Sequence, residues 1–232
     1  MNSSLPRRLV AETLGAALLV ATVVGSGIMA ESLTKDVALA LLANTLATGA
    51  MLVVLITILA PISGAHFNPV VSMVFWLKRD LSGREAASYS VAQIVGGIAG
   101  ALVAHLMFAL PLFELSTKAR TGGAQGFAEG IATFGLVATI LAGIRFERTA
   151  VPWLVGLYIT AAYWFTASTS FANPAVTIAR TLTNTFSGIR PIDAPAFVVA
   201  QGLGAVAALA LMNWLLREPV QPGEALPEEA IL

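Results

Sequence analysis

The sequence predicts an all-α membrane protein with six transmembrane helices and two re-entrant half-helices, arranged as an inverted repeat. Three observations carry this prediction: an apolar composition, two apolar segments too long for one crossing, and a set of motifs that recurs in both halves. The 232 residues are 57% hydrophobic and 11% charged, with a mean hydropathy of +0.82. Such values belong to membrane proteins rather than to soluble domains.

The charged and sulfur-containing residues limit the classes of function. The chain carries 13 basic and 13 acidic residues, so no charge excess suggests a nucleic-acid partner. It has no cysteine and only two histidines, which excludes disulfides and makes a metal site improbable. We therefore expect no metal, no cofactor and no nucleic acid, and a lipid bilayer as the surroundings.

Six apolar regions follow one another along the chain. They cover residues 9–30, 37–77, 86–113, 121–144, 149–179 and 194–216. The first follows Arg7 and Arg8 as a signal peptide would, but it is longer than a signal peptide's apolar core and more spans follow it. We interpret it as a retained transmembrane helix.

Two of these regions are too long for one crossing. Residues 37–77 and 149–179 contain no Asp, Glu, Lys or Arg, and as straight helices they would run about 60 and 45 Å. A bilayer core is only about 30 Å thick. Pro61, Gly64 and two Asn-Pro pairs interrupt these regions, which predicts a crossing, a return to mid-membrane and a half-helix. Irregular backbone at that depth is tolerated where it lines a cavity.

Each Asn-Pro pair is a helix start. The pairs are Asn68-Pro69, followed by Val70, and Asn173-Pro174, followed by Ala175. Asparagine is a favourable N-cap, and proline fits the first helical turn because its missing N–H would have no partner there.

The two halves, about residues 1–110 and 121–217, repeat the same motifs in the same order. Ala11-Glu12 corresponds to Ala128-Glu129, the first Asn-Pro to the second, and Ala92-Gln93 to Ala200-Gln201. Three spans per half is an odd number, so the second half is inverted, and such repeats form a site at the membrane midplane. We expect one channel domain over residues 1–217 and a cytoplasmic tail over 218–232.

The distribution of basic residues predicts cytoplasmic N- and C-termini. In this orientation eight basic residues are cytoplasmic: Arg7, Arg8, Lys78, Arg79, Arg84, Arg145, Arg148 and Arg217. Five are external: Lys35, Lys118, Arg120, Arg180 and Arg190.

The inverted arrangement brings the N-termini of the two half-helices together. Each N-terminus carries roughly half a positive charge, so a cation at the junction is disfavoured. The amides of Asn68 and Asn173 can still donate hydrogen bonds to a solute. The sequence therefore predicts a filter for small uncharged polar molecules, with no catalytic group.

These motifs together resemble the aquaporin (major intrinsic protein) family over residues 7–217. The resemblance implies a homotetramer with one pore per subunit. It implies that Gly64, Ala65 and His66 present pore-lining carbonyls on the cytoplasmic side, and Ser170, Phe171 and Ala172 on the outer side. A second reading makes the His66 ring a pH gate; we favour the lining role.

The sequence departs from the family pattern after the second Asn-Pro. The family has an arginine where this chain has Val176, and the resemblance maps the rest of the outer filter to Thr48, Ala161 and Ser170. This set has no charge and no ring, so we expect a wide filter.

The departures resemble the bacterial aquaporins of arsenic-resistance operons, which implies a bacterial inner-membrane location. That resemblance implies passage of undissociated trivalent arsenic acid and its methylated forms, with glycerol and water. The alternatives are an ordinary water and glycerol channel, or an inverted-repeat secondary transporter. An enzyme is not expected.

Three charged residues complete the predicted site. Arg180 lies one helical turn beyond Val176, and we expect it to replace part of the missing arginine; the alternative is a solvated or acid-paired residue at the mouth. Glu12 and Glu129 are expected to brace the re-entrant loops by accepting backbone hydrogen bonds. The alternative for the two acids is a proton relay.

Overall fold

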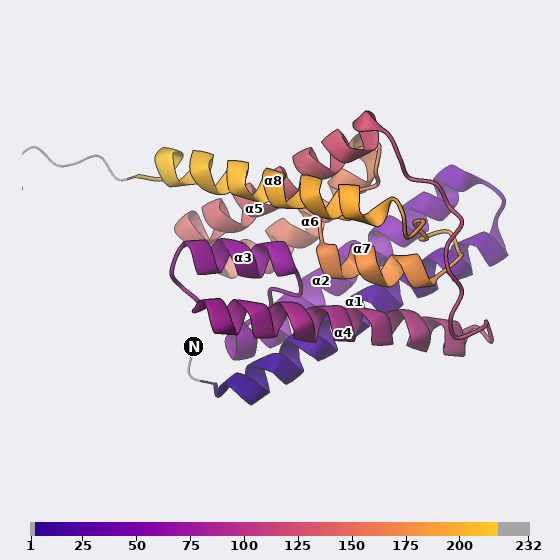
Figure 1. Ribbon diagram of the computed structural model, residues 1–232, viewed down its shortest axis with the longest axis horizontal. Coiled ribbons are helices and arrows are strands. Elements are labelled where there is room, and N and C mark those ends of the chain that lie inside the picture. Colours follow the sequence, from indigo (N-terminus) through magenta and orange to yellow (C-terminus); the bar gives the residue numbers. More distant parts are fainter. Residues whose placement is uncertain (1–2, 218–232) are drawn as a thin grey trace, which may run out of the picture.

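The computed structural model describes residues 3–217, and these form an all-helical arrangement (Figure 1). The helices, in chain order, are α1 (Leu5–Leu33), α2 (Val37–Ser63), α3 (Pro69–Leu77), α4 (Gly83–Met107), α5 (Gly123–Phe146), α6 (Val151–Phe165), α7 (Pro174–Ala179) and α8 (Ala194–Leu215). Two short 3₁₀ turns, η1 (Arg148–Ala150) and η2 (Arg180–Leu182), precede α6 and follow α7.

Local sequence signals account for where several helices begin. Asp36 caps α2 by accepting from the backbone N–H groups of Ala38 and Leu39. At α4, Ser82 and Glu85 form a reciprocal capping box. Asn68 and Asn173 cap α3 and α7 by accepting from backbone N–H groups, as Asp36 does for α2. Each asparagine is followed by proline at the first helical position.

The helix pairings repeat between the two halves. In the first half α1 packs against α2 and α4; in the second half α5 packs against α6 and α8. The pair α2 and α6 joins the halves, and the short helices α3 and α7 each contact both α4 and α8. In Figure 1, α3 and α7 lie end to end between α4 and α8. This is the inverted-repeat architecture that the sequence predicts.

Close approach of the long helices depends on glycine. A Cβ built on Gly96 or Gly100 of α4 would overlap the backbone oxygen of Thr13 or Ala17 in α1. In the second half, a Cβ on Gly204 of α8 would overlap the backbone oxygen of Gly130 in α5. Small residues at these crossings bring the helix backbones together, as in other membrane bundles.

Five described helices are long and apolar enough to cross a membrane: α1, α2, α4, α5 and α8. The sixth crossing, α6, has 15 residues and spans about 22 Å, extended at its start by η1. The start of α1 and the end of α8 lie at the same end of the molecule (Figure 1). The expected tail, residues 218–232, lies outside the described residues.

Candidate functional site

The two half-helices meet tip to tip through their asparagines. The Asn68 Nδ2 donates to the carbonyl of Ala172 at 2.7 Å, and the Asn173 Nδ2 donates to the carbonyl of Phe67 at 2.8 Å. Each side-chain oxygen meanwhile accepts from its own helix, at Val70 in α3 and at Ala175 in α7. Each asparagine thus starts one half-helix and ties it to the loop before the other.

Buried carboxylates hold both re-entrant loops. Glu12 accepts from the backbone N–H groups of His66 at 3.0 Å and Phe67 at 2.7 Å. Glu129 accepts from those of Phe171 at 2.8 Å and Ala172 at 2.9 Å. Both carboxylates are completely buried. Charge-assisted hydrogen bonds of this kind are the strong class and offset part of the cost of burial.

Two glutamines orient these carboxylates. Gln93 Nε2 donates to Glu12 at 2.8 Å and to Ser72 Oγ at 3.0 Å. Gln201 Nε2 donates to Glu129 at 2.6 Å and to Thr177 Oγ1 at 2.9 Å. The sequence repeat contains both glutamines, but their role as partners of the glutamates was not predicted.

The braced loops have an unusual backbone. Ala65 and Phe67 have positive φ angles of 52° and 49°, and Ser170 and Ala172 have φ angles of 49° and 48°. Left-handed conformations are costly for residues other than glycine and persist where surrounding contacts impose them. The hydrogen bonds to Glu12 and Glu129 supply such contacts, because they hold the N–H groups of the left-handed Phe67 and Ala172 and of the residue before each.

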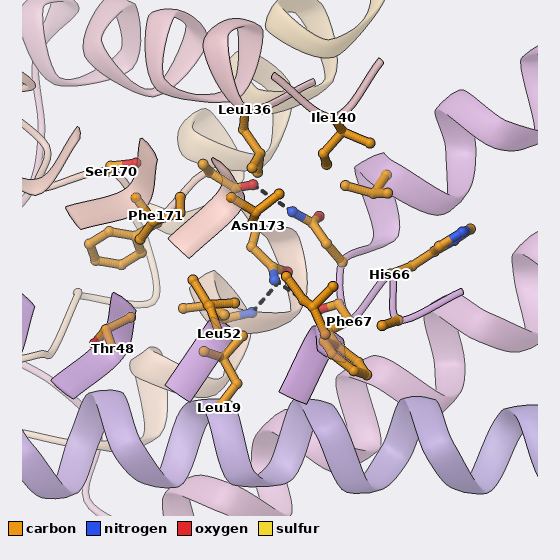
Figure 2. A pocket seen from close by; sticks show the side chains of 18 of the residues that line it. Leu19, Thr48, Leu52, His66, Phe67, Leu136, Ile140, Ser170, Phe171 and Asn173 are labelled. Atoms are coloured by element: carbon orange, nitrogen blue, oxygen red, sulfur yellow. Dashed lines mark hydrogen bonds between the residues drawn. The ribbon is translucent and has the colours of Figure 1, made fainter. Parts of the chain in front are cut away.

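A cavity of about 110 Å³ passes through the junction. Figure 2 shows His66 and Phe171 towards opposite ends of this cavity, with Asn173 between them. Apolar lining residues come from α1, α2, α5 and α6; Figure 2 shows Leu136 and Ile140 on one side of Asn173 and Leu19 and Leu52 on the other. The re-entrant loops line the cavity with Gly64, Ala65, His66, Ser170, Phe171 and Ala172, and both asparagines also line it.

At the end of the cavity near Phe171, two polar groups lack protein partners. Ser170 Oγ and Arg180 Nη1 are buried and make no hydrogen bond within the described residues. Arg180 is only 2% exposed; its Nε donates to the carbonyl of Ser187, and its guanidinium carbon lies 3.4 Å from the centre of the Phe171 ring. Thr48 and Val176 also line the cavity.

The expected filter position on α6 is wrong. Ala161 is exposed on α6 and is not among the cavity-lining residues. Ile159 and Tyr163 face the cavity from this helix instead, and the Tyr163 hydroxyl contacts Thr48 Oγ1 at 3.4 Å. Helical periodicity explains the error, because a shift of two residues moves a side chain about 200° around the helix. The Tyr163 ring therefore lines the cavity beside Thr48, where the sequence interpretation expected no ring.

The opposite end of the cavity contains His66 and Phe75. The His66 ring stacks on Phe75 with a centroid distance of 4.6 Å, and its Nδ1 lies 3.1 Å from Ser72 Oγ. Val70 does not line the cavity and instead belongs to the apolar cluster with Val137 and Leu141 of α5. Ala175 is buried in α7 and is likewise absent from the lining.

Three comparisons with known proteins bear on this site. The family model described as Major intrinsic protein matches residues 1–150 and 142–229. Aquaglyceroporin AqpS of Rhizobium meliloti (strain 1021) is 70% identical over 94% of this chain and 93% of its own length. A probable aquaporin AqpM of Archaeoglobus fulgidus is 32% identical over 69% of this chain and 70% of its own.

Among solved structures, the aquaglyceroporin from Plasmodium falciparum has a TM-score of 0.68 and 22% identity. The match covers 90% of this chain and 95% of that one. This likeness confirms the fold. With the family match, it follows that the chain belongs to the major intrinsic protein family. It is a passive membrane channel and not an enzyme.

Proposed function

We propose that the channel passes small uncharged, polyol-like solutes: glycerol, undissociated trivalent arsenic acid with its methylated forms, and water. The observation that carries this proposal is the pair of buried polar atoms, Ser170 Oγ and Arg180 Nη1, left without protein partners at the outer end of a largely apolar cavity. A solute with several hydroxyl groups supplies acceptors and donors to both. The aquaglyceroporin name of the 70% identical relative supports the glycerol part.

The geometry of the junction favours neutral solutes over ions. Two helix N-termini meet at Asn68 and Asn173, and their aligned peptide dipoles oppose a cation there. An ion must also lose its hydration shell here, and a largely apolar passage offers few ligands to replace the lost water. A neutral polyol loses less, because the loop carbonyls replace its bonds to water.

Purified protein in liposomes tests this function. Glycerol and trivalent arsenic acid fluxes, measured by stopped-flow light scattering and by solute uptake, should rise in proportion to concentration without an ion gradient. Glu12→Gln should show the same independence of the proton gradient as the unaltered channel. Saturating, gradient-dependent uptake would instead identify a secondary transporter. If water passed but neither glycerol nor trivalent arsenic acid did, the protein would be an ordinary water channel.

Within this function we assign Arg180 the task of the arginine that Val176 replaces. Its guanidinium lies one turn farther out than position 176 and lines the cavity. We expect Arg180→Ala to raise the leak of K⁺ and protons while neutral solutes still pass. Equal leak in both proteins, measured with ion-sensitive dyes in liposomes, would remove this role from Arg180.

The assembly and orientation belong to the same proposal. We infer a homotetramer with one pore per subunit, in a bacterial inner membrane, with both termini cytoplasmic. The basic residues Lys78, Arg145 and Arg217 line one pocket beside α3, α5 and α8, at the end of the molecule that holds the C-terminus of α8. That clustering fits the positive-inside rule.

A further inference from the structure

We propose that Arg120, from the loop between α4 and α5, is a positioning residue that supplies the net positive charge of the outer mouth and so determines its exclusion of cations. The inference rests on the proposed channel function and adds a residue outside both Asn-Pro motifs. It begins with the Phe171 ring, which lies near two guanidinium groups. The guanidinium carbons of Arg180 and Arg120 are 3.4 and 4.9 Å from its centre.

Arg120 is fixed in this place by hydrogen bonds rather than free in the loop. Its Nε donates to the carbonyl of Gly188 at 2.9 Å, and its Nη1 donates to the carbonyl of Ser168 at 3.1 Å. Its backbone N–H donates to Asp193 at 2.9 Å. The side chain thus links the outer loop to the segment that leads into the second re-entrant turn.

The balance of charge around Phe171 depends on Arg120. The acidic group that interacts electrostatically with both arginines is Glu129. Lys118 also interacts with both arginines, and its own acidic partner is Glu31. Asp193, the other acidic residue bound to Arg120, forms an ion pair with Arg190 at 2.9 Å. With Lys118 balanced by Glu31, Arg120 and Arg180 against Glu129 leave one net positive charge. Without Arg120, the charges of Arg180 and Glu129 would cancel.

A net charge matters here because the site is poorly solvated. Arg180 and Glu129 are 2% and 0% exposed, and charges in such surroundings are screened far less than charges at the surface. A cation that enters past Arg180, which lines the cavity, meets that net charge before it reaches the asparagine junction. A neutral solute does not, so the effect separates charged from uncharged molecules.

The test compares Arg120→Gln, Arg120→Lys and Lys35→Gln in liposomes, with K⁺ leak, proton leak and glycerol flux measured on the same preparations. We expect Arg120→Gln to raise cation leak on the order of tenfold, with glycerol flux changed less than about twofold. Arg120→Lys keeps the charge and should keep cation leak near the original value. Lys35→Gln removes an exposed charge from the loop between α1 and α2, for which no ion pair is seen within the described residues, and should leave leak unchanged.

Two results would overturn the inference. Unchanged leak in Arg120→Gln would show that its charge does not guard the pore. Equal increases in cation leak in Arg120→Gln and Arg120→Lys would show that the hydrogen bonds of the guanidinium group matter and its charge does not. Arg120 would then have a structural role only. Failure of the channel function itself would look different, because the unaltered protein would then pass no glycerol.

Discussion

The carboxylate of Glu12 determines the shape of the first re-entrant loop. It accepts hydrogen bonds from Ser63, His66, Phe67 and Gln93, all between 2.6 and 3.0 Å. Two of these donors are the backbone N–H groups of His66 and Phe67, in a turn where Phe67 is left-handed. Without Glu12, these N–H groups would face an apolar interior without partners. Both oxygens of the buried carboxylate therefore accept hydrogen bonds that hold the loop. This hydrogen bonding disfavours a role of Glu12 as a proton relay.

Replacing that carboxylate with an amide tests the bracing role. Glu12→Gln keeps the side-chain shape but turns one acceptor oxygen into a donor that faces other donors. We expect a loss of roughly 2 kcal/mol of stability, the scale of a hydrogen bond to a charged group, together with reduced glycerol flux. Thermal unfolding in detergent and flux in liposomes measure both effects. The bracing account is contradicted if the variant keeps its stability but loses a proton-driven uptake seen in the original protein.

At the same scale, the sequence predicts some site residues and misplaces others for identifiable reasons. Asn68, Asn173, Glu12 and Glu129 stand out because polar residues in long apolar segments need partners. Ala161 was misplaced because an apolar helix carries no polar face to fix its rotation. Arg120 was counted only as an external charge, since a loop without periodicity does not indicate where its side chains lie.

At the scale of elements, the crossing of α1 and α4 illustrates how the long helices position the site. Gly96 and Gly100 allow α4 to lie against the α1 backbone at Thr13 and Ala17. Close by along the same helices, Glu12 and Gln93 meet at 2.8 Å. The glycine contact therefore also sets the spacing of the buried hydrogen-bond network.

A methyl group at this crossing should separate the two helices. We expect Gly96→Ala to destabilise the protein by about 1–3 kcal/mol, because the new Cβ would overlap rigid backbone. Gly202→Ala in α8 is the matched control, since nothing lies within 4 Å of a Cβ built there. Thermal unfolding midpoints of the two variants provide the comparison. Equal midpoints would mean that the α1–α4 contact is not tightly packed.

At the scale of the whole molecule, the inverted repeat explains why the pore lies in the centre. Each half contributes one full set of helices and one half-helix, and the Asn68 and Asn173 bonds cross between the halves. This organisation could be predicted because the motifs recur in the same order. The paths of the outer loops, residues 108–122 and 183–193, could not, because they depend on tertiary hydrogen bonds such as those of His105 to Pro111 and Thr183.

We expect the proposed filter to separate solutes by size. Val176, Ser170 and Arg180 all line the cavity, and Val176 precedes Arg180 by one helical turn. An arginine side chain at position 176 would occupy space that is open in this protein and add a second guanidinium to the same end of the pore.

The most direct measurement is therefore the permeability of liposomes to water, glycerol and trivalent arsenic acid, made side by side for the unaltered channel and for Val176→Arg. The account predicts that the unaltered protein passes all three and that the variant loses most of its glycerol and arsenic flux. Undiminished passage of the larger solutes through a folded Val176→Arg channel would contradict it.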